Sequence, residues 1–151
     1  DPNSPDFIYF SNNINRSRIK LLNEYIDFNS IKNIIDVGAG NANFGFILKT
    51  LYPKIIYDTI EKDQNLINNY GPWVNDNFID IDLVVNKYDI VVLNQVLEHI
   101  QYPYKYLKKI STLMNKNSNI VVKTRIFLLN FFYLNIYVYS QPIYTTLNIV
   151  L

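Results

Sequence analysis

The short segment that ends in two glycines constrains the fold of this chain more than any other. Residues Asn33 to Val37 are mostly apolar and rich in β-branched side chains, and Gly38 and Gly40 follow directly. Such a run predicts a buried strand that opens into a tight turn, because glycine adopts backbone conformations that other residues avoid. Ala42 to Leu51 then has the apolar pattern of a helix. A strand, a glycine turn and a helix in this order form the unit from which parallel α/β sheets are built.

The rest of the chain continues this alternation of strands and helices. The sequence predicts further strands at 54–60, 88–93 and 119–123, helices at 14–28, 63–70 and 104–114, an extended lead-in at 1–10, and a short third strand within 73–85. This pattern predicts a Rossmann-like three-layer α/β/α sandwich with a mostly parallel sheet. The carboxyl ends of parallel strands share one edge of the sheet, and ligands bind at that edge.

The chain divides into a lead-in and helix (1–29), a Rossmann-like core (30–125) and a tail (126–151) that contains no charged residue. The tail is interrupted by polar residues too often to be a clean membrane span. It is predicted to form a terminal β-hairpin that turns near Ser140. An interfacial helix around 127–137 and a domain that is cut or altered at this point are the alternatives, and an apolar tail is also a candidate homodimer surface.

Composition excludes several classes of function. The 151 residues suit one domain, and 49% apolar and 18% charged residues fit a folded chain. A net charge of +1 gives no strong signal for nucleic acid. The chain has no cysteine and only one histidine, His99, which excludes disulfides, thiolate nucleophiles and multi-histidine metal sites. The first residues have no signal-peptide pattern, so a cytoplasmic location is expected.

The glycine turn is the first candidate binding site. Gly38 and Gly40 allow a ligand to approach the backbone, and the start of the next helix directs free N–H groups toward a carboxylate or phosphate. A tight turn without a ligand is the alternative. Dinucleotide sites place a third glycine at the position of Asn43, whereas this chain has Gly45 instead. This spacing disfavours an NAD-dependent oxidoreductase.

Acidic residues after the second and third strands are the next candidates. Glu61 follows Gly40 by 21 residues, the position at which a carboxylate accepts hydrogen bonds from ribose hydroxyls; Asp63 is its competitor. Asp76, expected after the short third strand, is the candidate to contact an adenine amino group. Its rivals in the same polar loop are Asn75, Asn77, Asp80 and Asp82.

The end of the fourth strand carries the remaining candidates. Asn94 and Gln95 stand where this strand reaches the ligand edge. His99 is a candidate general base because the pKa of histidine lies near neutral pH, and Asp89 is a second candidate. The alternative for His99 is that it caps or packs the following segment.

Two of these blocks together resemble a known family. Ile34 to Gly40 resembles motif I of class I S-adenosylmethionine-dependent methyltransferases, and Tyr88 to Ile100, followed by Pro103, is similar to their block that ends in Leu-Glu-His. The resemblance covers about residues 30–125. It implies a seven-stranded sheet, S-adenosyl-L-methionine as cofactor and in-line methyl transfer. The cofactor-binding positions that it implies are Asp36, Gly38, Ala39, Gly40 and Glu61, with Asp76 at the adenine and with Asn94 and Gln95 on the methionine or acceptor side.

The chain departs from this pattern at three places. Ala42 replaces a frequent third glycine, Asn117-Ser118 replaces a Gly-Gly turn, and only 26 residues follow Arg125 where the family continues with a helix and two strands. The predicted function is S-adenosylmethionine-dependent methyl transfer to a small-molecule acceptor. A cofactor-binding module or pseudoenzyme with an incomplete acceptor site is the alternative, and the oxidoreductase comes third.

Overall fold

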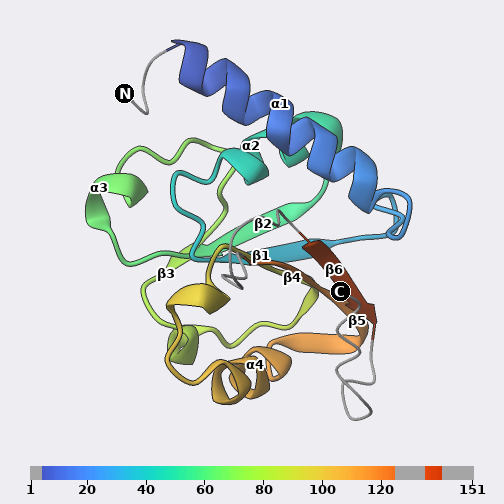
Figure 1. Cartoon of the computed structure of the whole chain (residues 1–151), viewed down its shortest axis with the longest axis vertical. Coiled ribbons are helices and arrows are strands. Elements are labelled where there is room, and N and C mark those ends of the chain that lie inside the picture. Colours follow the sequence, from blue (N-terminus) through green and yellow to red (C-terminus); the bar gives the residue numbers. More distant parts are fainter. Residues whose placement is uncertain (1–4, 125–134, 141–151) are drawn as a thin grey trace, which may run out of the picture.

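One six-stranded sheet organises the part of the chain that the structure describes, residues 5–124 and 135–140. In the computed structural model its strand order is β3-β2-β1-β4-β5-β6 (Figure 1). The strands are β1 (Asn33–Val37), β2 (Ile56–Ile60), β3 (Asn77–Phe78), β4 (Tyr88–Asn94), β5 (Met114–Thr124) and β6 (Asn135–Ser140). The first five are parallel, and β6 is antiparallel to β5. The predicted mostly parallel sheet is therefore confirmed.

Helices cover both faces of this sheet (Figure 1). They are α1 (Pro5–Leu22), α2 (Asn43–Leu51), α3 (Gln64–Ile67), the 3₁₀ helices η1 (Ile81–Leu83) and η2 (Leu97–His99), and α4 (Pro103–Ser111). Val92 of β4 belongs to the core cluster under α1 and α2, whereas its neighbour Leu93 belongs to the cluster that contains Ile110 of α4. Successive strand residues face opposite sides, so the sheet has a packed core on each face, as a three-layer sandwich requires.

The first helix differs from the prediction at both ends. It begins at Pro5, within the segment predicted to be extended, and ends at Leu22 rather than at residue 28. Proline is tolerated in the first turn of a helix, where its missing N–H would have no partner. The predicted helix was too long because the apolar residues Ile26 and Phe28 continue its spacing. They are buried, at 4% and 2% exposed, in the loop that follows the helix.

The later elements differ from the prediction mainly in their lengths. The helix predicted at 63–70 is confined to α3, the helix predicted at 104–114 ends at Ser111, and the strand predicted at 119–123 begins earlier, at Met114. Within the tail the structure describes only β6, so residues 135–137 lie in a strand and not in a helix; the rest of the predicted hairpin lies outside the described residues. None of the described helices is long and apolar enough to cross a membrane.

The strand register brings the carboxyl ends of four strands level. Val37 of β1 pairs with Ile60 of β2 and with Leu93 of β4, and Leu93 pairs with Val122 of β5. The residues that follow these positions therefore lie along one edge of the sheet. This edge holds the candidate site.

Candidate functional site

The two glycines after β1 have different surroundings. Both have positive φ angles, 66° at Gly38 and 59° at Gly40, which L-residues rarely adopt. A Cβ atom built on Gly38 would lie 2.8 Å from Cγ2 of Val96, whereas one built on Gly40 would meet no atom within 4 Å. Gly38 therefore allows the turn to pack against the segment after β4. Gly40 leaves open space beside the backbone.

The carboxylate of Glu61 is held beside this open space by three backbone N–H groups. Its Oε2 atom accepts from Gly40 over 2.9 Å, and its Oε1 atom accepts from Lys62 and Asp63 over 2.8 and 3.0 Å. A carboxylate has about four lone-pair sites, so Glu61 keeps the capacity to accept from a ligand. Asp63, its competitor in the sequence, uses its own side chain to cap α3 by accepting from the N–H of Asn65.

Tyr70 supports the glycine turn and was not identified from the sequence. Its hydroxyl donates to the carbonyl oxygen of Gly40 over 2.7 Å. Burial and the nearby charge of Glu61 raise the pKa of Tyr70, so the hydroxyl remains a donor across the physiological range. A tyrosine nine residues after Glu61 belongs to no motif, and only the folded chain brings it to the turn.

Asp36 is a buried acid beneath the turn. Its side chain is 2% exposed, and its Oδ2 atom accepts from the hydroxyl of Tyr57 over 2.6 Å. Its Oδ1 atom is buried and has no hydrogen-bond partner within the described residues. Burial raises the pKa of Asp36 to about 7, although the Tyr57 hydroxyl and the charge of Arg18 act in the opposite direction. Asp36 therefore changes charge near neutral pH.

Gly45 lets α2 approach β2 closely. A Cβ atom at this position would lie 2.1 Å from the ring of Tyr57. Close packing between helix and strand is the task of the third glycine in dinucleotide-binding turns. Gly45 stands two residues after the position that the dinucleotide spacing requires, and in the structure it performs this packing from there.

The end of β4 places polar groups at the same edge. Asn94 is the last residue of the strand, and its Oδ1 atom is buried without a partner in the described part of the chain. Gln95 has a φ of 59°, rare for a residue with a side chain, and its N–H donates to the carbonyl oxygen of Lys123 over 2.6 Å. His99 is exposed at the end of η2, and no hydrogen bond from another described residue orients its imidazole.

Two sequence-predicted acids lie elsewhere. Asp76 comes one residue before β3 and not after it, and its N–H donates to the buried carboxylate of Asp58. A strand of two residues carries too little pattern to be located from the sequence, which is why its ends were misplaced; Asp80 is an acid that does follow it. Asp89 lies near the amino end of β4, where its carboxylate accepts from the N–H of Lys32 over 2.9 Å. It is therefore at the opposite edge from the glycine turn.

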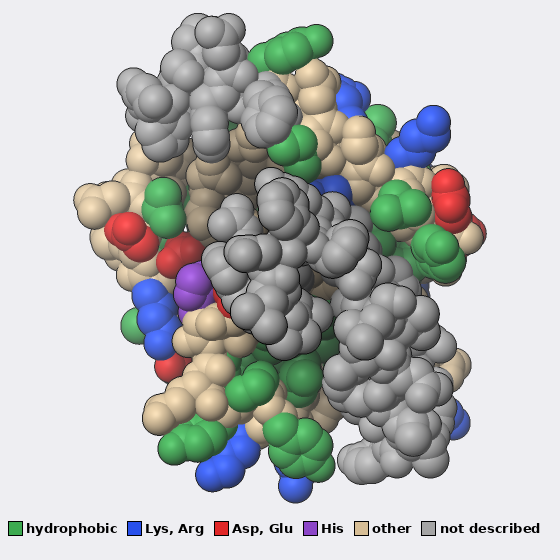
Figure 2. Space-filling model, in the orientation of Figure 1, with side chains coloured by type: hydrophobic (Ala, Val, Ile, Leu, Met, Phe, Trp, Pro, Cys, Tyr) green, Lys and Arg blue, Asp and Glu red, His purple; other side chains and the backbone are tan. Residues whose placement is uncertain are grey.

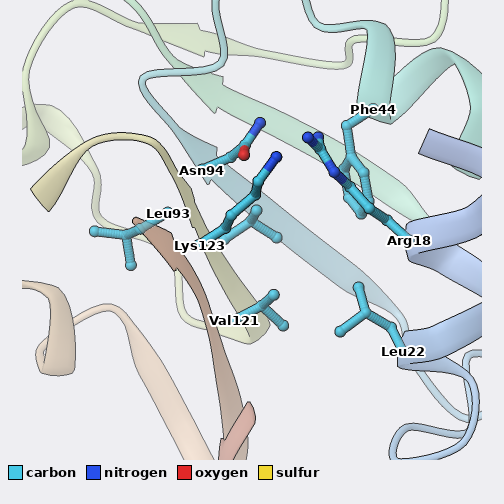
Figure 3. A pocket seen from close by; sticks show the side chains of 8 residues that line it. Arg18, Leu22, Phe44, Leu93, Asn94, Val121 and Lys123 are labelled. Atoms are coloured by element: carbon cyan, nitrogen blue, oxygen red, sulfur yellow. The ribbon is translucent and has the colours of Figure 1, made fainter. Parts of the chain in front are cut away.

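A small cavity adjoins the site beneath α1. It is lined by Arg18, Leu22, Phe44, Val92, Leu93, Asn94, Val121 and Lys123. Figure 3 shows the polar ends of Arg18, Asn94 and Lys123 converging at one end of this cavity, while Leu22 and Val121 lie toward the other end. Burial lowers the pKa of Arg18, and the charge of Asp36 opposes that effect. The cavity was not foreseen: Arg18 and Leu22 lie within the predicted helix at 14–28, but the sequence pattern does not show how that helix packs on β4 and β5.

The described residues contain no candidate metal site, and one face of the molecule shows no large charged field. Within residues 5–124 and 135–140, no group of three or more histidine or acidic side chains could hold a metal ion. On the face shown in Figure 2, the basic and acidic side chains that are coloured are interspersed and do not form one field.

Comparison with protein families identifies one match. The model of a methyltransferase domain matches residues 9–134, which is most of the chain. A search of curated protein sequences finds no match.

Similar solved structures share this fold at low sequence identity. Coclaurine N-methyltransferase bound to N-methylheliamine and S-adenosylhomocysteine has a TM-score of 0.65 and 15% identity, covering 73% of this chain and 35% of that one. The plantazolicin methyltransferase BpumL, in complex with a pentazolic desmethylPZN analogue and S-adenosylhomocysteine, has a TM-score of 0.60 and 16% identity, covering 82% of this chain and 49% of that one. An O-methyltransferase of a Brevibacillus brevis multienzyme has a TM-score of 0.55 and 20% identity, covering 64% and 36%. The chain thus spans less than half the length of these proteins.

Proposed function

Because the chain belongs to the methyltransferase-domain family, we propose that it binds S-adenosyl-L-methionine and transfers its methyl group to a small-molecule acceptor. The observation that carries this proposal is the pairing of Gly40 with Glu61 beside open space. The three solved structures named above are methyltransferases in complex with S-adenosylhomocysteine. This shared ligand supports the choice of cofactor.

The residues at the edge of the sheet fit this cofactor. Glu61 is fixed by backbone donors and retains lone pairs for ribose hydroxyls. Gly38, Ala39 and Gly40 provide a turn that a ligand can approach, and at Gly40 a side chain would occupy the open space. Asp80, which follows β3, replaces Asp76 as the candidate for the adenine contact.

Unpaired acceptors suit the amino-acid end of the cofactor. The Oδ1 atoms of Asp36 and Asn94 are both buried without donors from the described residues, and an ammonium group has three donors and no acceptor. An ionised Asp36 also favours the positive charge of the ligand. We assign Asn94 to the amino group, with Asp36 supplying charge from beneath and Gln95 lining the same edge.

Methyl transfer requires little from the protein besides position. When bound, the cofactor supplies an electrophilic methyl group on a sulfonium. The residues of this chain hold the two reactants in line and keep water away. A general base is needed only for a hydroxyl or a protonated nitrogen acceptor. His99 is the candidate for that role and would have to be oriented by the acceptor.

Binding experiments separate this proposal from its rivals. Calorimetry with S-adenosylhomocysteine and with NAD should show saturable binding of the first and none of the second. Binding of NAD alone would instead support an oxidoreductase. A Gly40→Val variant should lose the binding of S-adenosylhomocysteine while remaining folded by circular dichroism.

Turnover then distinguishes an enzyme from a binding module. The native chain is incubated with S-adenosylmethionine and a panel of small hydroxyl, amine and carboxylic acid acceptors, and the release of S-adenosylhomocysteine is measured. Acceptor-dependent release supports a methyltransferase. Tight cofactor binding without release from any acceptor supports a binding module. With a hydroxyl acceptor, His99→Gln should lower the rate and leave cofactor affinity unchanged.

A further inference from the structure

One cationic side chain of the cavity beneath α1 has a buried donor without a partner among the described residues. Arg18 donates from Nη1 to Asn15 over 2.9 Å, but its buried Nε atom has no partner within the described residues. A guanidinium carries five N–H donors. None of the ion pairs among the described residues involves Arg18. Lys123 adds a second cationic side chain to the same end of the cavity (Figure 3). This end of the cavity is therefore suited to an anion.

The rest of the cavity is apolar and small. Val92 lies two residues before Asn94 on β4, and Val121 lies two residues before Lys123 on β5, so each apolar side chain shares a face with the polar one. The cavity volume is about 20 Å³, and a single water needs roughly 10–15 Å³. The cavity therefore admits one small end group of a ligand and not a whole molecule.

The cavity lies on the side of the site away from Glu61. In the sheet order, β5 is three strands from β2, which corresponds to about 14 Å at a strand spacing of about 4.8 Å. Lys123, at the carboxyl end of β5, therefore lies well beyond the position proposed for the ribose. This places Lys123 on the side of the site away from the ribose.

We propose that this cavity is an acceptor subsite for a carboxylate, bound by Arg18 and Lys123. The proposal rests on the proposed function and narrows its acceptor to an amphipathic carboxylic acid. A carboxylate is planar and matches the fork of a guanidinium through two parallel hydrogen bonds. Leu22 and Val121 provide apolar surface for the carbon atoms next to the carboxylate. The atom that receives the methyl group is not specified by this subsite.

Three probes of equal length test the preference for an anion. Hexanoate, hexanamide and hexylamine are titrated into the 151-residue chain saturated with S-adenosylhomocysteine, and binding is followed by saturation-transfer NMR at fixed ionic strength. Hexanoate should bind saturably, and the other two should bind at least about tenfold more weakly, the loss expected when a charge-assisted contact is missing. Equal binding of acid and amide, or no saturable binding of hexanoate, would overturn the proposal.

Variants locate the binding to this cavity. Arg18→Gln and Lys123→Gln should each weaken hexanoate binding about tenfold or more. Arg16→Gln is the matched control, because Arg16 is an exposed arginine on the same helix; it should leave hexanoate binding unchanged. Arg18→Lys keeps the positive charge, and its affinity for hexanoate should lie between those of the native chain and of Arg18→Gln. If Arg16→Gln weakened binding as much as Arg18→Gln, the anion would be attracted by general charge and the subsite would be refuted.

A second comparison identifies the source of the carboxylate. The cofactor also carries one, so Arg18→Gln is tested with S-adenosylhomocysteine and with 5′-methylthioadenosine, which lacks the amino-acid end. The proposal expects both affinities to be unchanged. A loss for S-adenosylhomocysteine alone would assign the cavity to the cofactor and overturn an acceptor subsite. If the native chain bound hexanoate but not S-adenosylhomocysteine, the proposed function would fail while an anion site remained.

Discussion

The backbone N–H of Gly40 donates to Oε2 of Glu61 over 2.9 Å, and this bond joins the turn after β1 to the end of β2. The two residues are 21 positions apart in the sequence. Because the N–H groups of Lys62 and Asp63 fix the other carboxylate oxygen, the acid has one orientation before any ligand arrives. Preorganisation of this kind reduces the entropy that binding would otherwise cost.

The first prediction concerns this carboxylate. Glu61→Gln replaces one acceptor oxygen by an NH₂ group that faces backbone donors, so the side chain must turn away from its present position. We expect the affinity for S-adenosylhomocysteine to fall about tenfold to a hundredfold, as for the loss of a hydrogen bond to a charged group. Calorimetry measures the change. Asp63→Asn is the control, because asparagine also caps helices well and should leave the affinity as it is.

The second prediction separates the two glycines of the turn. Gly38→Ala and Gly40→Ala each place a Cβ at a positive φ, which costs about 1–2 kcal/mol. Gly38→Ala also brings the new atom against Val96, and overpacking adds about 1–3 kcal/mol. Urea denaturation should therefore show the larger loss of stability at Gly38. Adding Val96→Ala to Gly38→Ala should recover part of the lost stability. Equal stability of Gly38→Ala and Gly40→Ala would contradict the predicted contact with Val96.

The third prediction concerns Gly45. Glycine to alanine within a helix normally stabilises by about 1 kcal/mol. Here the added Cβ would overlap the ring of Tyr57, so Gly45→Ala should instead destabilise by about 1–3 kcal/mol or more. The cost should shrink in a Tyr57→Leu background, which a double-mutant cycle in denaturant measures. A stabilising effect of Gly45→Ala in the native background would show that the ring moves aside freely.

The fourth prediction concerns the pH dependence of stability. Burial raises the pKa of Asp36 to about 7, against about 3.9 in an unfolded chain. Between about pH 4 and pH 7 the folded state keeps a proton that the unfolded state has lost, so the free energy of unfolding falls as pH rises through this window. Above pH 7 the full penalty applies, up to about 4 kcal/mol from a difference of about three pKa units.

Urea denaturation at several pH values between 4 and 8 measures how the free energy of unfolding changes with pH. Asp36→Asn removes the titrating group while its side-chain oxygen can still accept from Tyr57. The variant should therefore gain stability relative to the native chain as pH rises from 4 to 7. Glu24→Gln is the control, because Glu24 is an exposed acid; its free energy of unfolding should change with pH as that of the native chain does. Parallel curves for the native chain and Asp36→Asn would contradict the buried titration.

The sequence predicted the central strands well, because each is a mostly apolar run buried on both faces. The strand at 33–37 has the same bounds in the structure, and β4 extends the predicted strand by one residue. Periodicity failed where burial continued past the end of an element, as at Ile26 and Phe28. It also failed at β3, whose two residues show no period at all.

Residues of the candidate site could be predicted only where their type and their spacing in the sequence both match a known binding pattern. Gly40 and Glu61 were linked in advance by their separation in a strand–turn–helix–strand unit, and the structure brings them together. Tyr70 and Arg18 reach the site through loop geometry and helix packing, which no local pattern encodes. Asp76 was misplaced because its role depended on the end of a strand too short to locate.

The ring of Tyr57 connects two properties that are usually independent. The ring itself limits how near α2 can come to the sheet at Gly45, and its hydroxyl donates a hydrogen bond to the titrating carboxyl of Asp36. An alanine at position 45 would require a smaller side chain at position 57, and that replacement would remove the hydroxyl from the acid. Positions 36, 45 and 57 should therefore be redesigned together. A substitution at position 57 that is chosen for packing also removes the hydrogen bond that lowers the pKa of Asp36 beneath the turn.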